Sequence, residues 1–349
     1  MKYVITGGSG YIGTRLTEFL VGRKDTELVA IADVKPPRYP RANVEFHRTD
    51  VRDRDAIRAL LDRVKPDALV HLAFVLNPIR DEATMYDIDV NGTLYVLDAA
   101  SAAGTPHVLV TSSTTAYGAW PDNQEPMTEE HMLRGQPDFA YARHKTEADR
   151  LCGLWAAEHP DRTMTIVRPC IVFGPSVDNY ISRFYENAPF GPRFRGEPDR
   201  NVQYIHEDDL AEAISRLLTG RHAGAFNATG DGVLTWQECA ELAGLKVRTM
   251  PYSLAYRLNS IQWRLRVPGV ESPPGNLGFI RYGWVCSNDK LKQTLGWAPK
   301  HDSRETFLQT MRARGVIQPA AGAEARELSA RKSSNGSDRE PVAGSTGQE

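Results

Sequence analysis

The chain has 349 residues, of which 41% are apolar and 25% are charged, as is usual for a globular protein with enough chain for one large or two smaller domains. The formal net charge is −2 and no long basic stretch occurs, so we expect no nucleic-acid partner.

Short β-type segments alternate with helical patterns in the first half of the chain. Strands are predicted at 2–6, 27–32, 44–48, 68–73, 107–112 and 164–169. Helices are predicted near 12–22, 53–64, 84–103 and 141–158. Nearly all-apolar strands that alternate with helices predict an α/β fold, a Rossmann-type doubly wound parallel sheet covered on both faces.

The pattern changes after about residue 175, where Pro, Gly and aromatic residues become frequent. We predict a nucleotide-binding domain over 1–175, to which 201–230 returns. A smaller, irregular C-terminal substrate lobe is predicted from 176–200 and 231–317. The tail, 318–349, has almost no large apolar residue, so it is predicted to be disordered.

A glycine-rich turn, "TGGSGYIG", follows the first strand and opens the first helix. Gly7, Gly10 and Gly13 have the spacing that lets the backbone turn tightly and approach a pyrophosphate. The helix N-terminus behind such a turn offers free N–H groups and a positive dipole end to phosphate. The turn therefore predicts a dinucleotide site.

Asp33 ends the second strand, 20 residues beyond Gly13. An acid there accepts hydrogen bonds from the adenosine ribose and repels a 2′-phosphate, which favours NAD over NADP. Lys35 and Arg38 lie close by and weaken this preference. Asp50 ends the third strand and has two interpretations: an acceptor for the adenine amino group, or the cap of the next helix.

A Ser/Thr cluster, "TSSTTAYG", ends the fifth strand, and Tyr141 and Lys145 follow in "YARHK". The carboxyl end of a strand in an open α/β sheet faces the ligand crevice, which makes Ser113 a candidate site residue. Tyr141 and Lys145 are four residues apart, on one side of a helix. The spacing alone is common by chance. Arg143 and His144, between them, are expected on the helix surface.

Taken in order, these segments resemble the extended short-chain dehydrogenase/reductase superfamily, and within it the NAD-dependent epimerase/dehydratase family, with members such as UDP-galactose 4-epimerase. The resemblance covers about residues 1–312 and rests on "TGGSGYIG", Asp33, "DVRD", "HLAF", "DVNGT", "SSTTAYG", "YARHK", "RPCIVFGP", "YIHEDDLA" and "LGWAPK". It implies a Rossmann fold, NAD as cofactor and a small-molecule substrate.

The resemblance also implies residue roles. Tyr141 would be the general acid/base, Lys145 would lower its pKa and hold the nicotinamide ribose, and Ser113 would orient the reacting oxygen. The implied cofactor contacts are Gly7, Gly10, Tyr11, Ile12, Gly13, Asp33, Asp50, Val51, Leu72, Ala73, Tyr141, Lys145 and Val172. Two long helices, 84–103 and 141–158, can form a four-helix bundle, so a homodimer is one option.

Several residues depart from the family pattern. Asp89 stands where members often have an Asn that touches the cofactor, and Thr114 and Thr115 replace the Asp-Glu of dehydratases, which favours an epimerase. Ile171 and Val202 replace an Asn and an Arg that contact the nucleotide sugar. A diphosphate then needs another cation, and the candidates are Arg183, Arg193, Arg195, Arg200 and Arg281.

Three functions are open: an NAD-dependent oxidoreductase or epimerase acting at a carbinol or carbonyl carbon of a sugar or sugar nucleotide, an NAD(P)-dependent dehydrogenase or reductase of a less polar alcohol or ketone, and a non-catalytic NAD(P) sensor. Four scattered cysteines and nine histidines have no metal-ligand spacing, so we expect reduced thiols and no metal. With no signal peptide and no apolar stretch of about 18 residues, we expect a cytoplasmic protein without a membrane partner.

Overall fold

The computed structural model describes residues 1–38 and 41–318. The tail that was predicted to be disordered lies outside the described residues from position 319 onward.

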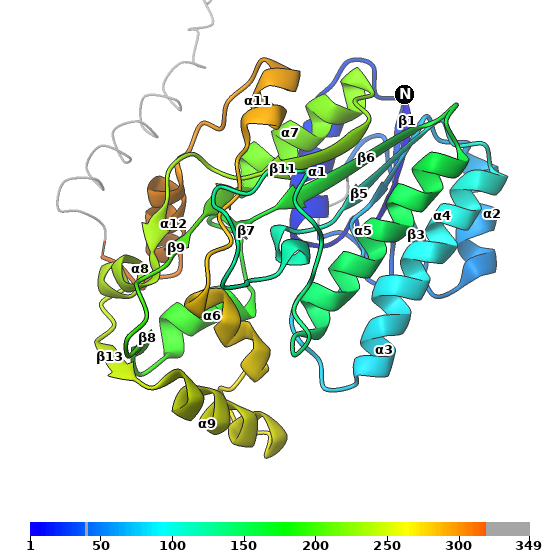
Figure 1. The fold of residues 1–349 in the computed structure, drawn as a ribbon. Helices are drawn as coiled ribbons and strands as arrows, with labels where there is room; N and C mark the ends of the chain where they lie inside the picture. Colours follow the sequence, from blue (N-terminus) through cyan, green and yellow to red (C-terminus); the bar gives the residue numbers. More distant parts are fainter. Residues whose placement is uncertain (39–40, 319–349) are drawn as a thin grey trace, which may run out of the picture.

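A seven-stranded parallel sheet forms the centre of the molecule (Figure 1). Its order is β11-β6-β5-β4-β1-β2-β3, so the strand order reverses between β1 and β4. The strands span Lys2–Thr6 (β1), Leu28–Asp33 (β2), Val44–Arg48 (β3), Ala68–His71 (β4), His107–Thr111 (β5), Thr163–Pro169 (β6) and Gly224–Ala228 (β11). The predicted fold class, a Rossmann-type α/β fold with a parallel sheet, is confirmed.

Helices cover both faces of this sheet (Figure 1). Helices α1 (Tyr11–Val21) and α7 (Glu207–Gly220) pack on one face, and α2 (Arg54–Val64), α4 (Gly92–Ala102) and α5 (Ala140–Glu158) pack on the other. The two apolar layers explain why the strands are apolar on both sides rather than alternating.

Helix α2 begins one turn later than an Asp50 cap would require. Asp53 is the N-cap, and its carboxylate accepts a hydrogen bond from the Ala56 N–H at 3.0 Å. Asp50 instead forms an ion pair with Arg52 at 2.6 Å. The interpretation of Asp50 as a helix cap is therefore wrong.

The single helix predicted at 84–103 is interrupted. It consists of α3 (Glu82–Tyr86), a π-helical turn η1 (Asp87–Asn91) and α4. A π-helical turn has one residue more than an α-helical turn, so the side chains that follow it are rotated about the helix axis. Asp89 lies in this turn and is fully buried.

The second lobe is built from short elements around its own apolar core (Figure 1). Three small two-stranded sheets pair β7 with β10, β8 with β13 and β9 with β12. Its strands are Ile171–Phe173 (β7), Gly191–Phe194 (β8), Asn201–Val202 (β9), Tyr204–His206 (β10), Leu234–Thr235 (β12) and Val247–Met250 (β13). Its helical segments are Tyr180–Asn187 (α6), Trp236–Leu242 (α8), Tyr252–Arg264 (α9), Pro274–Leu277 (η3), Gly278–Arg281 (α10) and Ser303–Ala313 (α12). Helix α11 (Asp289–Leu295) instead packs against α7 and β11 of the main sheet.

Segment 201–230 contributes to both parts of the molecule. Strand β11 pairs with β6 at the edge of the main sheet, whereas β10 pairs with β7. The exact division of the chain into domains stays a prediction.

A buried polar network connects β6 to its surroundings. The guanidinium of Arg168 donates to both carboxylate oxygens of Asp149 on α5, at 2.8 and 2.9 Å, and to the hydroxyl of Tyr117 at 2.8 Å. Tyr117 in turn donates to Asn227 on β11 at 2.8 Å. Charged groups this deep are stable only when they are paired and hydrogen-bonded.

All four cysteines are free and buried. Among the helices of residues 1–38 and 41–318, none is both long enough and apolar enough to cross a membrane.

Candidate active site

The glycine-rich turn joins β1 to α1 with no space for larger side chains. Gly7 has a φ of +70°, and a Cβ on it would lie 2.6 Å from the backbone nitrogen of Ala73. A Cβ on Gly13 would lie 2.6 Å from the carbonyl oxygen of Gly7. Both positions therefore require glycine, and Ala73 is placed directly against the turn.

The N-terminus of α1 is available to a ligand. Gly10 is the N-cap, so no side chain caps this end of the helix, and the buried hydroxyl of Ser9 has no hydrogen-bond partner among the described residues. Free N–H groups and an unpaired hydroxyl beside a glycine turn fit the pyrophosphate of a dinucleotide.

Asp33 lies beside this turn, at the carboxyl end of β2. Its two carboxylate oxygens accept hydrogen bonds from the N–H groups of Ser9 at 3.0 Å and Lys35 at 3.1 Å. Both contacts hold the carboxylate beside the glycine-rich turn, and its role toward a ribose stays a prediction. Asp50 lies in the neighbouring β3–α2 connection, and the hydrogen bonds from Arg52 lower the pKa of its carboxyl.

The other predicted cofactor contacts are distributed over several elements. Tyr11 and Ile12 open α1, and Leu72 and Ala73 follow β4. Val172 is the central residue of β7. Val51 is buried and leaves room only for glycine at position 92. Their roles toward the cofactor stay predictions.

Ser113 and Tyr141 lie together beyond the carboxyl end of β5. Ser113 caps the 3₁₀ turn Thr114–Tyr117 (η2), and its hydroxyl accepts a hydrogen bond from the Thr115 N–H at 3.2 Å. Burial raises the pKa of Tyr141, and the Ser113 side chain beside the phenol opposes this shift. The phenol and the Ser113 hydroxyl are therefore in position to share one substrate oxygen.

Lys145 is buried one turn further along α5. Its ammonium donates to the Thr111 carbonyl oxygen at 2.7 Å and lies 3.5 Å from the centroid of the Phe74 ring. The same ring packs edge-on against Tyr141, with centroids 5.7 Å apart. Burial lowers the pKa of Lys145 to about 7, and the Asp89 carboxylate opposes that shift.

His144 is not on the helix surface, as the sequence suggested, but is 2% exposed. Its Nδ1 donates to Asp89 at 2.9 Å, and the other oxygen of Asp89 accepts from the Val75 N–H at 2.8 Å. The expectation was wrong because the π-turn η1 brings Asp89 under α5. Residue 144 also lies three positions after Tyr141, which puts the two residues on the same side of α5.

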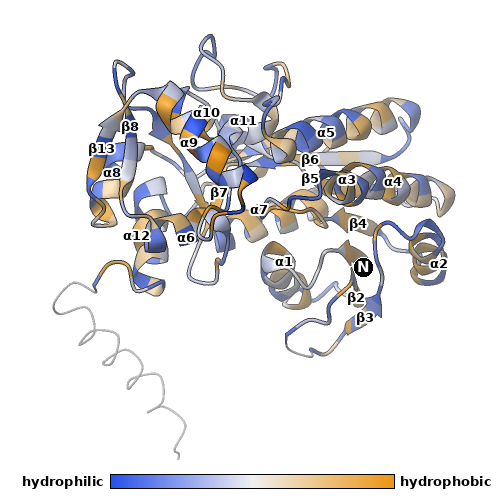
Figure 2. Cartoon of the chain, turned by 90° about the horizontal axis from the view of Figure 1, so that it is seen from below, coloured by the Kyte–Doolittle hydropathy of each residue, from blue (hydrophilic) through white to orange (hydrophobic). Residues whose placement is uncertain are grey.

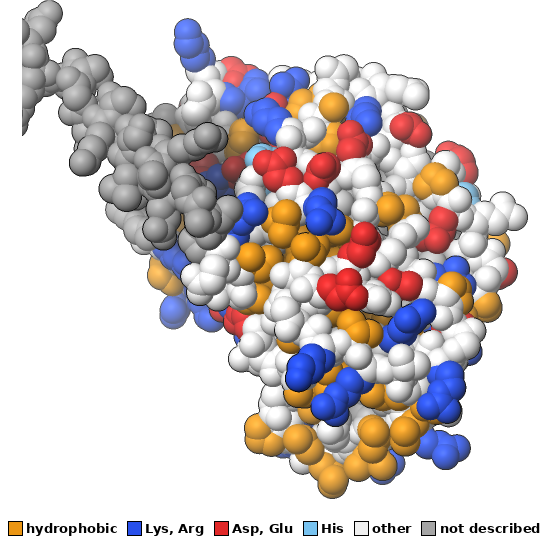
Figure 3. Space-filling model, turned by 90° about the vertical axis from the view of Figure 1, so that its left-hand side faces the viewer, with side chains coloured by type: hydrophobic (Ala, Val, Ile, Leu, Met, Phe, Trp, Pro, Cys, Tyr) orange, Lys and Arg blue, Asp and Glu red, His pale blue; other side chains and the backbone are white. Residues whose placement is uncertain are grey.

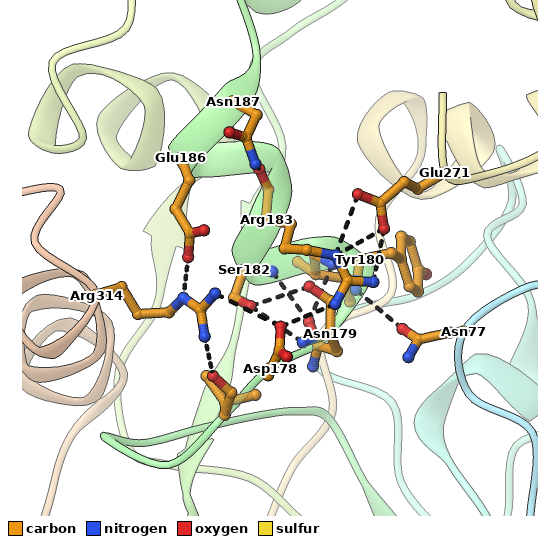
Figure 4. A network of polar contacts seen from close by, with 12 residues as sticks. Asn77, Asp178, Asn179, Tyr180, Ser182, Arg183, Glu186, Asn187, Glu271 and Arg314 are labelled. Atoms are coloured by element: carbon orange, nitrogen blue, oxygen red, sulfur yellow. Dashed lines mark hydrogen bonds and ion pairs between the residues drawn. The ribbon is translucent and has the colours of Figure 1, made fainter. Parts of the chain in front are cut away.

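The second lobe reaches the site through α6. Tyr180 at the start of this helix is buried, which raises the pKa of its phenol, and the neighbouring Tyr141 adds to this rise. Its N–H donates to Asn77 from the loop after β4 at 3.0 Å. Figure 4 shows Asn77 and Glu271 on the same side of α6, next to its first residues. Sequence analysis missed Tyr180, which no motif marks.

Most of the five candidate arginines are already paired. Arg183 contacts Glu271 at 2.6 Å and Asp178 at 2.8 Å (Figure 4). Arg281 contacts Glu197 at 2.7 Å, and Arg200 donates to the Arg281 carbonyl. The remaining two, Arg193 and Arg195, are exposed on or next to β8. Within the described ranges, no group of three or more His, Cys, Asp or Glu residues is placed to hold a metal ion.

Residues 3–228 match the model of the "NAD dependent epimerase/dehydratase family". The chain belongs to this family, whose cofactor is the NAD expected from the sequence.

Relatives and solved structures agree with this assignment. The chain is 28% identical to a UDP-glucose 4-epimerase of Rhizobium meliloti over 333 residues, covering 86% of this chain and 92% of that one. A UDP-glucose 4-epimerase of Thermus thermophilus, solved with NAD, superposes with a TM-score of 0.69 at 22% identity, over 91% of this chain and 100% of the other. A dTDP-glucose 4,6-dehydratase of Bacillus anthracis gives a TM-score of 0.69 at 16% identity, over 91% and 97%.

Proposed function

We propose that this chain is an enzyme that transfers hydride between NAD and a carbinol or carbonyl carbon, with Tyr141 as the general acid/base. The observation that carries the proposal is the convergence of Ser113, Tyr141 and Lys145 beside the carboxyl end of β5. NAD supplies the hydride acceptor and donor. The Tyr141 phenol exchanges the proton of the substrate oxygen, Ser113 orients that oxygen, and the Lys145 ammonium stabilises the phenolate.

We further propose that the net reaction is epimerisation of a sugar or sugar nucleotide rather than dehydration. Loss of water needs an additional acid and base near the substrate, and Thr114 and Thr115 follow Ser113 instead of carboxylates. The relation to a UDP-glucose 4-epimerase along most of both chains supports the same choice.

A second candidate is oxidation or reduction of a less polar alcohol or ketone. It is favoured by Ile171 and Val202, both buried where a nucleotide sugar would need polar contacts, and by the pairing of Arg183 and Arg281 with acids. Such a substrate would need no cation for a diphosphate.

Product mass separates these reactions. Purified protein is incubated with UDP- and dTDP-hexoses, and separately with a panel of alcohols and ketones plus NAD or NADH. An epimerase yields an isomer of unchanged mass without net NADH, a dehydratase yields loss of water, and a dehydrogenase yields loss of two hydrogens with stoichiometric NADH. If no substrate class gives a product that disappears with Tyr141→Phe, the proposal is wrong and a sensor without turnover is the better description.

A further inference from the structure

Helix α9 carries an apolar stripe on its outer side. Four large apolar side chains are exposed on it: Leu254 by 46%, Leu258 by 47%, Ile261 by 55% and, at the C-cap, Leu265 by 72%. They follow one another at spacings of four, three and four residues, so they form one line along the helix. An exposed apolar line of this length is unusual on a protein surface unless something binds it.

The inner side of α9 contacts residues from the first half of the chain. Ala255 is buried, and the Tyr256 hydroxyl donates to Asp138 at 2.8 Å. Trp263 lies under the guanidinium of Arg80, 3.7 Å from its ring centroid. The apolar stripe is therefore not the inward side of a helix that has swung away from its core.

The charged residues of the segment that carries the stripe are all positive. Between positions 252 and 270 the sequence has three arginines, Arg257, Arg264 and Arg266, and no Asp or Glu. All three are exposed, and none forms an ion pair with the described part of the chain. Arg257 and Arg264 lie along one border of the stripe, and Arg266 follows its C-terminal end.

Figures 2 and 3 show where this surface lies on the molecule. Apolar residues recur along α9 in Figure 2, and in Figure 3 hydrophobic side chains gather at the lower end, with Lys and Arg side chains around and above them. Figure 1 places α9 at that lower end, at the rim of the second lobe and away from the sheet. A flat surface can approach α9 there without meeting the rest of the molecule.

We propose that α9 docks the protein onto an anionic lipid bilayer, lying in the plane of the headgroups. An amphipathic helix with leucines on one side and arginines beside them inserts its apolar side at the headgroup–acyl boundary and pairs its cations with lipid phosphates. A second copy of this chain is a poorer occupant, because a two-fold interface would bring the three arginines toward their own copies with no acid to pair them. The expectation of no membrane partner rested on spanning segments and does not bear on a helix that lies on the surface.

Vesicle co-sedimentation of the full-length protein with NAD tests this proposal. We expect binding to vesicles of phosphatidylcholine with about 30% phosphatidylglycerol, little binding to phosphatidylcholine alone, and a strong loss between about 0.1 and 0.5 M salt. Leu258→Ser with Leu265→Ser should lower partitioning at least about tenfold. Arg257→Gln and Arg264→Gln should each lower it about fivefold on anionic vesicles and leave thermal unfolding unchanged.

The control protein carries Met132→Ser and Arg58→Gln, which remove a similarly exposed apolar side chain (76%) and an exposed arginine from other segments. It should bind vesicles like wild type. The proposal is overturned if wild type does not sediment with anionic vesicles, or if the α9 leucine variant sediments as well as wild type. It is also overturned if sedimentation velocity shows that the α9 leucines hold two copies of the chain together and vesicles do not compete.

Discussion

The phenol of Tyr141 lies where the end of β5, helix α5 and the start of α6 meet, between Ser113, Phe74 and Tyr180. Replacing it with Phe keeps the ring and its packing against Phe74 but removes the hydroxyl that we propose exchanges a proton with the substrate. We expect Tyr141→Phe to lower turnover by about 10²- to 10⁴-fold, the usual contribution of one acid/base group. Stopped assays with the product panel measure turnover. Calorimetric titration measures the affinity for NAD, which should change little.

The control for this variant is Tyr95→Phe on α4, a half-buried tyrosine with no part in the site. Its turnover should match wild type. If the Tyr141→Phe and Tyr95→Phe variants were equally active, Tyr141 would not be the general acid/base.

The buried Asp89 carboxylate acts on Lys145. Burial shifts the pKa of Lys145 to about 7, and the Asp89 charge keeps it from falling further. Asp89→Asn removes that charge, so the pKa of Lys145 should fall. The proposed mechanism needs the ammonium form of Lys145. The alkaline limb of the kcat/KM profile should therefore shift to lower pH. Asp87→Asn, two residues earlier and half-buried, should leave this limb in place.

At the level of elements, the turn between β1 and α1 permits little variation. Gly7→Ala would add a methyl group 2.6 Å from the Ala73 nitrogen and place a side chain at a φ of +70°. We expect a loss of NAD binding and a clear fall in melting temperature. Gly104→Ala has a similar φ of +67° but nothing within 4 Å of its Cβ, so it should cost only the backbone strain, about 1 kcal/mol.

Sequence analysis found those elements whose signals are local. The Gly7–Gly13 turn, the apolar strands and the spacing of Tyr141 from Lys145 follow directly from periodicity and backbone requirements. Each predicted segment overlaps its strand or helix, with ends that differ by at most two residues. The π-turn η1 escaped because no residue pattern distinguishes it from continuous α-helix. Its consequence, a buried His144 against Asp89, escaped with it. Tyr180 and the stripe on α9 depend on how two lobes pack, which a single sequence does not encode locally.

For the molecule as a whole, the pair Arg168–Asp149 ties β6 to α5, and through Tyr117 to β11. Asp149→Ala would leave a buried guanidinium without its anion, at a cost of about 3–5 kcal/mol in the free energy of unfolding. Denaturant unfolding measures it. Asp98→Ala, which breaks an exposed pair with Arg54, should cost less than about 1 kcal/mol. Similar losses in both variants would show that the buried network adds no special stability.

The association of two chains is a separate expectation at this scale. Leu94 on α4 and Leu154 on α5 are 40% and 62% exposed, which is consistent with the predicted dimer through these helices. Leu154→Arg should then convert a dimer to a monomer in sedimentation velocity, with the fold unchanged by circular dichroism. A wild-type protein that is already monomeric at micromolar concentration would exclude this mode of association.

The pair formed by Asp89 and His144 also restricts the order in which the two residues can have arisen. An Asn at position 89 can accept a hydrogen bond from the Val75 N–H and can also form one with either tautomer of the His144 ring. A histidine at 144 is therefore tolerated beside an Asn at position 89. An Asp at 89 without a partner at 144 would be a buried carboxylate that lacks one of its two hydrogen bonds, which is strongly unfavourable. The histidine at position 144 is therefore expected to have arisen before the aspartate at position 89. Sequences that carry Asp at this position should carry a hydrogen-bond donor three residues after the tyrosine that corresponds to Tyr141. Such a lineage is identified by two positions 55 residues apart.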